Sequence, residues 1–281
     1  MTHRLLAFFA HPDDESFGLA GSIAKLAAQR IPTTLVCATR GEVGQISHPA
    51  LATAENIGAV RERELRAAAQ AMKLDRLILL DYRDSGMEGT DENHDPRAFV
   101  NQPAHEVVAR LAQLIRQAQP SVVVTFDPQG GYGHPDHIAI HQHAVAAFHA
   151  AADPSYMPAL GQPWQASRLF YNVIPRSRIA LMRDQMATLG EDPSRFDRFA
   201  ERAWPDEKVH LTVDVTGQFA AKWQALMCHR TQLGDEHLFR RIDVDTVQRI
   251  MGREHFALAW PEPTPDLRLE TLFDGLTRGP Q

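Results

Sequence analysis

The chain has 281 residues and carries 29 Lys and Arg against 35 Asp and Glu, so its formal net charge is −6. This acidic balance argues against a basic nucleic-acid binder. Hydrophobic residues make up 44% and charged residues 23% of the chain, near the averages of about 45–50% and 25% for folded domains, which excludes disordered and fibrous classes.

Short apolar runs alternate with longer helical patterns through the first half of the chain. The predicted strands cover residues 5–10, 33–39, 76–80 and 121–126, and the predicted helices between them cover 16–30, 54–72 and 103–119. Such alternation is typical of a parallel sheet covered by helices. We therefore predict an α/β fold, a Rossmann-like three-layer arrangement with a mostly parallel sheet.

The pattern weakens after residue 150, where three prolines precede the strand-like runs 169–174 and 209–215 and a helix over 218–229. Two interpretations compete: a separate C-terminal domain, or strands and helices that complete the sheet and wall a site at its edge. Neither half of this region looks large enough to bury its own core. We therefore expect one domain over 1–281, with a Rossmann-like core (1–150) and a C-terminal extension (151–281).

The sequence also predicts where the protein resides. The first apolar run is shorter than the roughly 7 to 15 residues at the centre of a signal peptide, and no stretch approaches the roughly 18 apolar residues of a membrane helix. The two cysteines, Cys37 and Cys228, are far apart and form no C-x-x-C pattern, which predicts reduced thiols rather than a disulfide framework or a cysteine-rich zinc site. We expect a cytoplasmic protein with no membrane partner.

Two similar tetrapeptides follow predicted strands. One is 11–14, His-Pro-Asp-Asp, after the first strand, and the other is 134–137, His-Pro-Asp-His, after the fourth. Proline favours the first helical position, so each box is predicted to start a helix, and its first and fourth residues share a helix face. Helix capping alone could explain one such box, but two matching boxes at strand ends favour a shared site.

Ligands of open α/β sheets bind at the carboxyl ends of the strands, where both boxes fall. The two boxes offer a nitrogen and oxygen donor set that suits a zinc ion with three protein ligands. The donors are His11 and Asp14 together with His134 or His137, and the spacing does not decide between the last two. Asp13 and Asp136 remain free for proton transfer.

Residues 10–15 and 133–137 resemble the two signature motifs of the LmbE-like (PIG-L) superfamily, which are zinc-dependent N-deacetylases of N-acetylglucosamine conjugates. The resemblance covers most of residues 4–150, and 151–205 has no match. Further similarity lies at 39–42, Arg61, Glu64, 84–87 and 130–132, and more weakly at 229–232.

The resemblance implies a role for each residue of the boxes. His11, Asp14 and His137 become the ligands of one Zn²⁺ per chain, with Fe²⁺ as the alternative metal, and Asp13 becomes the general base. His134 becomes the acid or the oxyanion partner. Tyr132 resembles a mobile tyrosine that helps to hold the tetrahedral intermediate, although it could simply be an aromatic lid.

Charged residues after the second and third strands are predicted to border the same crevice and to bind substrate: Arg40, Glu42 and Asp84. Arg61, in the second predicted helix, joins them as a candidate through the resemblance. The resemblance implies that Arg61 and Asp84 contact the glucosamine ring. For Arg61, a solvated helix position is the competing interpretation.

We therefore expect a hydrolase that removes the N-acetyl group from an N-acetylglucosaminyl small molecule and releases acetate. In similar proteins the aglycone is often inositol or malate. The close alternative is an amidase acting on a thiol-conjugated glucosaminide. From other classes, a non-catalytic metal-dependent sugar-binding protein and a dinucleotide-binding protein are weaker alternatives, since residues 130–133 lack the G-x-G-x-x-G spacing. No nucleic-acid partner is expected, and a homo-oligomer stays open.

Overall fold

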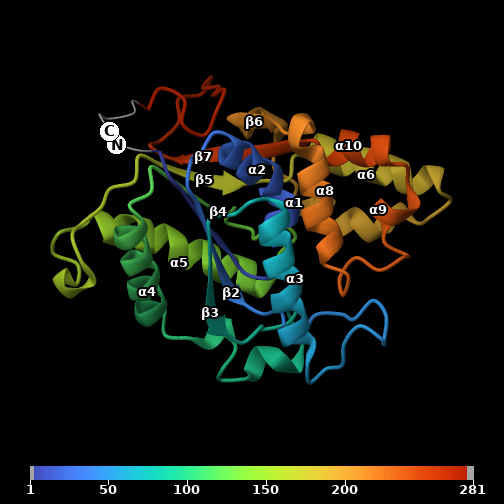
Figure 1. Cartoon of the computed structure of the whole chain (residues 1–281), viewed down its shortest axis with the longest axis horizontal. Coiled ribbons are helices and arrows are strands. Elements are labelled where there is room, and N and C mark those ends of the chain that lie inside the picture. The colour runs from blue at the N-terminus through green and yellow to red at the C-terminus, as the bar shows by residue number, and fades with distance from the viewer. Residues whose placement is uncertain (1–2, 277–281) are drawn as a thin grey trace.

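A seven-stranded sheet in the order β3-β2-β1-β4-β5-β7-β6 forms the centre of the computed structural model (Figure 1), which describes residues 3–276 except for the side chains of Arg195 and Arg198. The first five strands in this order are parallel, and β7 pairs antiparallel with both β5 and β6. The strands are β1 (Leu5–Phe9), β2 (Thr33–Thr39), β3 (Arg76–Tyr82), β4 (Val122–Phe126), β5 (Arg168–Asn172), β6 (Leu211–Asp214) and β7 (Arg253–Trp260).

Helices cover both faces of the sheet. On one face α4 packs against α5, and on the other α8 packs against α2 and α3 (Figure 1). The α-helices are α1 (Asp14–Gly18), α2 (Ala20–Ala28), α3 (Ile57–Ala71), α4 (Ala104–Ala118), α5 (Pro135–Ala152), α6 (Arg176–Thr188), α7 (Asp197–Arg202), α8 (Phe219–Cys228), α9 (Leu238–Arg241) and α10 (Val244–Met251). Short 3₁₀ helices are η1 (Asp91–His94), η2 (Phe99–Asn101), η3 (Pro158–Leu160), η4 (Pro193–Phe196), η5 (Asp206–Lys208) and η6 (Thr216–Gln218).

The predicted fold class is confirmed, and strand β2 has the predicted bounds. One predicted helix, 16–30, is instead two helices that meet at Leu19, whose φ of −141° leaves the helical range. The cause lies far away in sequence. Asn172 of β5 donates a hydrogen bond to the Gly18 carbonyl (3.0 Å), and a Cβ at Gly18 would lie 2.2 Å from its amide oxygen. Gly18 therefore lets β5 approach and interrupt the helix.

Strand β1 is buried along its whole length, as expected for a central parallel strand with helices on both faces. Residues after 150 contribute β5, β6 and β7 to the same sheet. They also form a second apolar cluster around Met186, Leu226 and Phe239, between α6, α8, α9 and α10. Both clusters bury apolar side chains that each contribute about 1.5–3 kcal/mol of stability.

The strand order places a crevice beside β1. The chain moves from β1 to β2 and β3 on one side, whereas β4 and β5 lie on the other side, so the order reverses between β1 and β4. Ligands of such sheets bind at this reversal, outside the carboxyl ends of the strands. Both His-Pro-Asp boxes follow these two strand ends.

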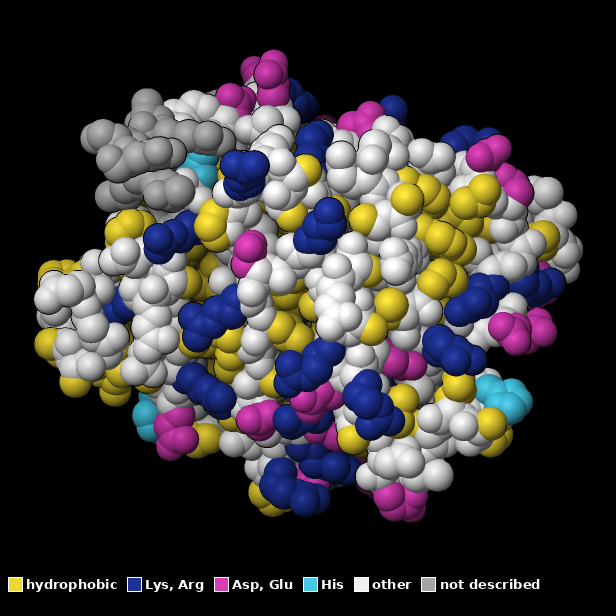
Figure 2. Space-filling model, viewed as in Figure 1, with side chains coloured by type: hydrophobic (Ala, Val, Ile, Leu, Met, Phe, Trp, Pro, Cys, Tyr) yellow, Lys and Arg dark blue, Asp and Glu magenta, His cyan; other side chains and the backbone are white. Residues whose placement is uncertain are grey.

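None of the helices in residues 3–276 combines the length and apolar character that a bilayer crossing requires. On the face seen in Figure 2, Lys and Arg side chains are scattered and interspersed with acidic ones.

Candidate active site

The first box does not start a helix at its proline. The first helix begins at Asp14, and Asp13 before it has a φ of 115°, which is rare for a residue other than glycine. The Asp14 carboxylate folds back and accepts hydrogen bonds from the backbone N–H groups of His11 (2.8 Å) and Ala10 (3.1 Å). The predicted meeting of His11 and Asp14 therefore occurs through these backbone contacts rather than along a helix face.

The second box follows the predicted pattern. Helix α5 begins at Pro135, and His134 is its N-cap, with Nδ1 accepting the N–H of Asp136 (3.1 Å). His137 lies one turn into the helix and faces the first box. Its Nε2 is 3.3 Å from a carboxylate oxygen of Asp14 and 3.1 Å from Nδ1 of His11.

The other nitrogen of each ring is held by an acceptor. His11 Nε2 lies 3.1 Å from Asp136 Oδ2, and His137 Nδ1 lies 3.2 Å from the Gly130 carbonyl. When these acceptors hold the only ring protons, as metal binding requires, His11 Nδ1 and His137 Nε2 face each other as lone pairs, with Asp14 beside them. Three acceptors that meet without a donor suit a cation, and acceptors bound at about 2.0–2.2 Å in a tetrahedron stand about 3.3 Å apart.

Negative charge is concentrated around His11. Its nitrogens lie 3.1 Å from Asp136, 3.5 Å from Asp84 and 3.8 Å from Asp14. Burial by itself lowers the pKa of His11, but the charges and hydrogen bonds of Asp84 and Asp136, with the charge of Asp14, raise that pKa well above its usual value. The site is therefore built to hold positive charge.

Other donor sets overlap with this one. Ligand atoms of His11, His134 and His137 lie within 4.8 Å of one another, as do those of a second set comprising His11, Asp84, His134 and Asp136. In the second set both oxygens of each carboxylate accept hydrogen bonds, whereas the two backbone hydrogen bonds of Asp14 fall on Oδ2 and its Oδ1 faces His137. Asp136 accepts hydrogen bonds from the N–H and the hydroxyl of Ser85, and Asp84 accepts from the N–H groups of Gly86 (2.9 Å) and Val43 (3.4 Å). We therefore favour the set that includes Asp14.

Asp13 is next to Asp14 in the chain, and its carboxylate accepts a hydrogen bond from Arg61 (3.2 Å). Burial raises the pKa of Asp13 to about 6, and the charge of Asp14 also raises it, whereas the charge of Arg61 lowers it. A carboxylate with this pKa can accept a proton near neutral pH.

His134 is a neutral donor in this environment. Burial lowers its pKa to about 2, helped by the charges of His11 and His137. Because Nδ1 accepts the N–H of Asp136, the ring proton is on Nε2. His134 can therefore donate a hydrogen bond from Nε2 but does not carry a positive charge.

A cavity of about 380 Å³ opens at Asp13, Asp14 and His137, a size that suits small-molecule ligands. The Tyr132 ring is on its wall, 5.1 Å from the ring of His137 and 5.1 Å from that of Phe199. Burial raises the pKa of Tyr132 and keeps its hydroxyl protonated. Most of the remaining wall is apolar and comes from Phe17, Ile174, Ile179, Met182, Met186, Phe196, Phe199, Leu238 and Phe239.

The four residues predicted to bind substrate lie outside the wall of this cavity. The described residues that line it do not include Arg40, Glu42, Arg61 or Asp84. Arg40 pairs with Glu62 (2.6 Å) and Asp81 (2.7 Å). Glu42 accepts the N–H of Asp84 (3.1 Å).

Arg61 and Asp84 are buried closer to the histidines. Arg61 donates to the carbonyls of Pro12 (2.6 Å) and Gly41 (3.2 Å) as well as to Asp13. It is therefore not the solvated helix residue of the competing interpretation. Asp84 faces His11 and lies 4.0 Å from His134 Nε2.

Sequence reasoning missed the cavity wall and three polar residues. Ser85 holds Asp136, and Glu15 pairs with His229 (2.8 Å) behind Asp13. Glu15, Ser85 and His229 belong to the segments that carry the family resemblance, which was the available signal. The apolar wall comes largely from α6, η4, α7 and α9, for which the sequence offered no motif.

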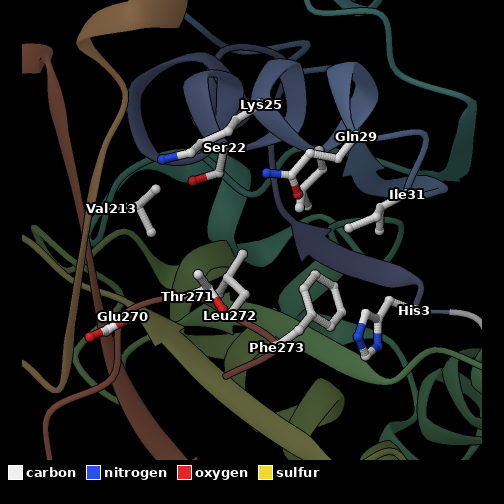
Figure 3. Close-up of a pocket in the computed structure, with 11 residues that line it drawn as sticks. His3, Ser22, Lys25, Gln29, Ile31, Val213, Glu270, Thr271, Leu272 and Phe273 are labelled. Carbon is white, nitrogen blue, oxygen red and sulfur yellow. The ribbon is translucent and has the colours of Figure 1, made fainter. Parts of the chain in front are cut away.

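A second cavity, of about 210 Å³, lies at the amino-terminal end of β1, between α2 and residues 270–273 (Figure 3). His3 at its wall precedes β1, whereas His11 follows β1, so the two cavities are at opposite ends of that strand. His3 stacks on Phe273 at 4.6 Å between ring centroids. Among the described residues, those that line this second cavity include none from the two His-Pro-Asp boxes.

Comparison with known proteins agrees with this geometry. The GlcNAc-PI de-N-acetylase (PIG-L) family matches residues 6–148. The chain is 37% identical to the 1D-myo-inositol 2-acetamido-2-deoxy-alpha-D-glucopyranoside deacetylase of Geodermatophilus obscurus, over 98% of both chains.

Solved structures share the fold. N,N'-diacetylchitobiose deacetylase from Pyrococcus horikoshii has a TM-score of 0.63 at 22% identity, covering 91% of this chain and 83% of that one. The 4-carboxy-2-hydroxymuconate hydratase GalB from Pseudomonas putida has a TM-score of 0.62 at 21% identity, covering 93% and 98%. The chain belongs to the GlcNAc-PI de-N-acetylase family, and the expectation of a deacetylase is confirmed.

Proposed function

We propose that this family member binds one zinc ion through His11, Asp14 and His137 and removes the N-acetyl group from an N-acetylglucosaminyl-inositol conjugate. The observation that carries the proposal is the meeting of His11 Nδ1, His137 Nε2 and Asp14 within 3.1–3.8 Å, with Asp13 next to them. The whole chain, 1–281, is proposed to act as one domain.

Bound there, zinc supplies a Lewis acid that polarises an amide carbonyl and lowers the pKa of water toward about 7. Asp13 accepts the proton of the attacking water, because its pKa of about 6 leaves the carboxylate ionised at neutral pH. Asp14 is unsuited to this task, since the charges of His137 and His11 outweigh the effect of its burial and hold its pKa below the usual range.

Two neutral donors complete the site. We assign His134 Nε2–H and the Tyr132 hydroxyl to the oxygen of the amide carbonyl as negative charge develops on it. Because His134 is neutral, Asp13 rather than His134 carries the proton onward to the leaving amine. Asp136 is fully buried behind His11, so we assign it to orienting that ring rather than to direct proton transfer.

The proposed substrate follows the relative from G. obscurus, whose name specifies an inositol glycoside of N-acetylglucosamine. On the cavity wall, Arg178, Glu236 and Arg241 offer polar atoms to the hydroxyl groups of an aglycone. We keep Asp84 and Arg61 as candidates for sugar recognition, although their present contacts engage other protein groups.

The test is to load the protein with zinc and measure acetate release from N-acetylglucosaminyl-inositol, from free N-acetylglucosamine and from a thiol-conjugated glucosaminide. The first should be hydrolysed fastest. Preferential hydrolysis of the thiol conjugate would favour the amidase alternative. Asp13→Asn should keep its zinc and lose about two to four powers of ten in turnover, whereas Asp14→Asn should lose zinc. The reverse pattern would contradict the assigned roles.

A further inference from the structure

The backbone of Asp13 is held in an uncommon conformation at the place where the proposed base must point toward the substrate. Its φ of 115° lies in the region that favours glycine, and a conformation of this kind persists only when the surroundings enforce it. The side chain is held by Arg61. Arg61 also donates to the carbonyl of Pro12 (2.6 Å), on one side of the Pro12–Asp13 peptide, and the N–H of that peptide has a partner of its own.

The Asp13 N–H donates a hydrogen bond to Oε2 of Glu15 (3.0 Å). The other oxygen of Glu15 accepts the hydroxyl of Ser16 (2.6 Å) and lies 2.8 Å from Nε2 of His229. Glu15 is 1% exposed and His229 is 0% exposed. The Glu15 carboxylate therefore joins the backbone of Asp13 to a histidine from the far end of the sequence.

His229 is fixed in place by the segment that follows it. Thr231 donates its N–H and its hydroxyl to Glu64 of α3 (2.9 and 2.6 Å). The Ser47 N–H donates to the Thr231 carbonyl (2.9 Å). Within the described residues, Nδ1 of His229 is buried with no hydrogen-bond partner. The polar contacts of this ring are thus all directed at Glu15 and Ser16.

We propose that Glu15 and His229 form a positioning pair that holds the backbone of Asp13 in its left-handed conformation and so aims the carboxylate of the base. The inference rests on the proposed function insofar as Asp13 is the base. Neither residue lines the catalytic cavity. Both therefore act through Asp13 and have no expected contact with substrate.

A matched pair elsewhere in the fold serves as the control. Glu254 is also a buried carboxylate, accepts two backbone N–H groups, from Gly21 (2.9 Å) and Ser22 (2.8 Å), and pairs with a buried base, Lys222 (2.5 Å). These hydrogen bonds of Glu254 involve neither Asp13 nor a residue of the two boxes. Glu254→Gln should therefore lower thermal stability as Glu15→Gln and His229→Gln do, without their effect on turnover.

The kinetic test compares these three zinc-loaded variants with the unmodified protein on N-acetylglucosaminyl-inositol. Glu15→Gln and His229→Gln should lower kcat about 10- to 100-fold, the scale of a small misplacement of a reacting group, with full zinc content and KM within about twofold. Glu254→Gln should keep its kcat. Equal kcat in all three variants, or a parallel loss of zinc in the first two, would overturn the positioning role.

A second readout does not depend on activity. The Asp13 amide hydrogen should exchange slowly with solvent in the unmodified protein and much faster in Glu15→Gln and His229→Gln, but not in Glu254→Gln. Unchanged exchange at Asp13 would refute the positioning pair whatever the enzyme hydrolyses. Changed exchange in a protein that hydrolyses no N-acetylglucosaminide would instead overturn the proposed function and leave the positioning pair standing.

Discussion

His11 Nδ1 lies 3.1 Å from His137 Nε2, and the remaining nitrogen of each ring is directed at an acceptor, Asp136 for His11 and the Gly130 carbonyl for His137. The raised pKa of His11 favours a proton on its ring in the metal-free protein, and Nδ1 can then donate to His137. A metal ion between the two rings would replace that proton and bind both nitrogens, so metal binding should stabilise the fold as well as enable catalysis.

The first prediction concerns these ligands. His11→Ala and His137→Ala each remove one of three donors and should abolish retention of zinc after dialysis at low free zinc, measured by elemental analysis. His141→Ala is the control, because its Nδ1 is bonded to the Phe126 carbonyl (2.8 Å) one turn beyond the second box. A His137→Ala protein that retains one equivalent of zinc would contradict the assignment and point to His134.

The second prediction concerns the carboxylate behind His11. Asp136→Asn replaces an acceptor that fixes the tautomer of His11, and this should weaken zinc affinity about 10- to 100-fold. Competition with a chelating dye measures the effect. Ser85→Ala removes the hydroxyl that donates a hydrogen bond to Asp136 and leaves the carboxylate in place. It should therefore cause a smaller loss of zinc affinity. An unchanged affinity in Asp136→Asn would mean that the protein backbone alone orients His11.

The third prediction concerns His134. If this ring donates from Nε2 to the developing oxyanion, His134→Ala should lower kcat about 10²- to 10³-fold, as other oxyanion donors do. Zinc content should stay at one equivalent. Loss of zinc in this variant would place His134 among the metal ligands, and a full kcat would remove it from the reaction altogether.

The fourth prediction concerns stability and pH, away from the metal ligands. Burial, together with the charges of Arg178 and Lys222, lowers the pKa of His255 to about 4, whereas an unfolded histidine titrates near 6.5. Between these values the unfolded chain binds more protons, so this residue should make the free energy of unfolding fall as the pH drops from 6.5 toward 4. Above pH 6.5 it contributes no pH dependence.

Urea unfolding between pH 7.5 and 4.5 tests this. His255→Gln should show a shallower decline in unfolding free energy than the unmodified protein across the window, while replacement of the exposed His105 by Gln should leave the decline as it is. Equal slopes for His255→Gln and the unmodified protein would show that the ring is protonated in the folded state without penalty.

The first half of the fold was predictable because its signals are local. Strand β2, for example, is an apolar run bounded by Pro32 and by Arg40 and Gly41. Strand β7 was missed because Arg253, Glu254 and His255 hide the start of its apolar run. The break between α1 and α2 depends on Asn172, about 150 positions later in the chain, and no pattern near Gly18 announces it.

The second box could be placed from sequence because helix α5 begins at Pro135 as the pattern predicts, whereas Asp14 meets His11 through backbone contacts that no spacing announces. The neighbours of Asp13 could not. Arg61 reaches Asp13 only because α3 packs beside the first box, and Arg40, Glu42 and Asp84 were placed at strand ends by topology alone. Topology fixes the edge of the sheet at which a residue lies, but the partner of a charged side chain depends on packing between distant segments.

The proposed proton-transfer and ligand groups come from residues 11–137, whereas much of the cavity wall comes from residues 172–241. These two stretches can therefore diverge at different rates. Substitutions at Met182, Met186 or Phe199 would reshape what the enzyme admits while sparing the groups that carry out hydrolysis. A laboratory search for altered substrate range would gain most by randomising that wall, with the boxes and the segment 229–232 held constant.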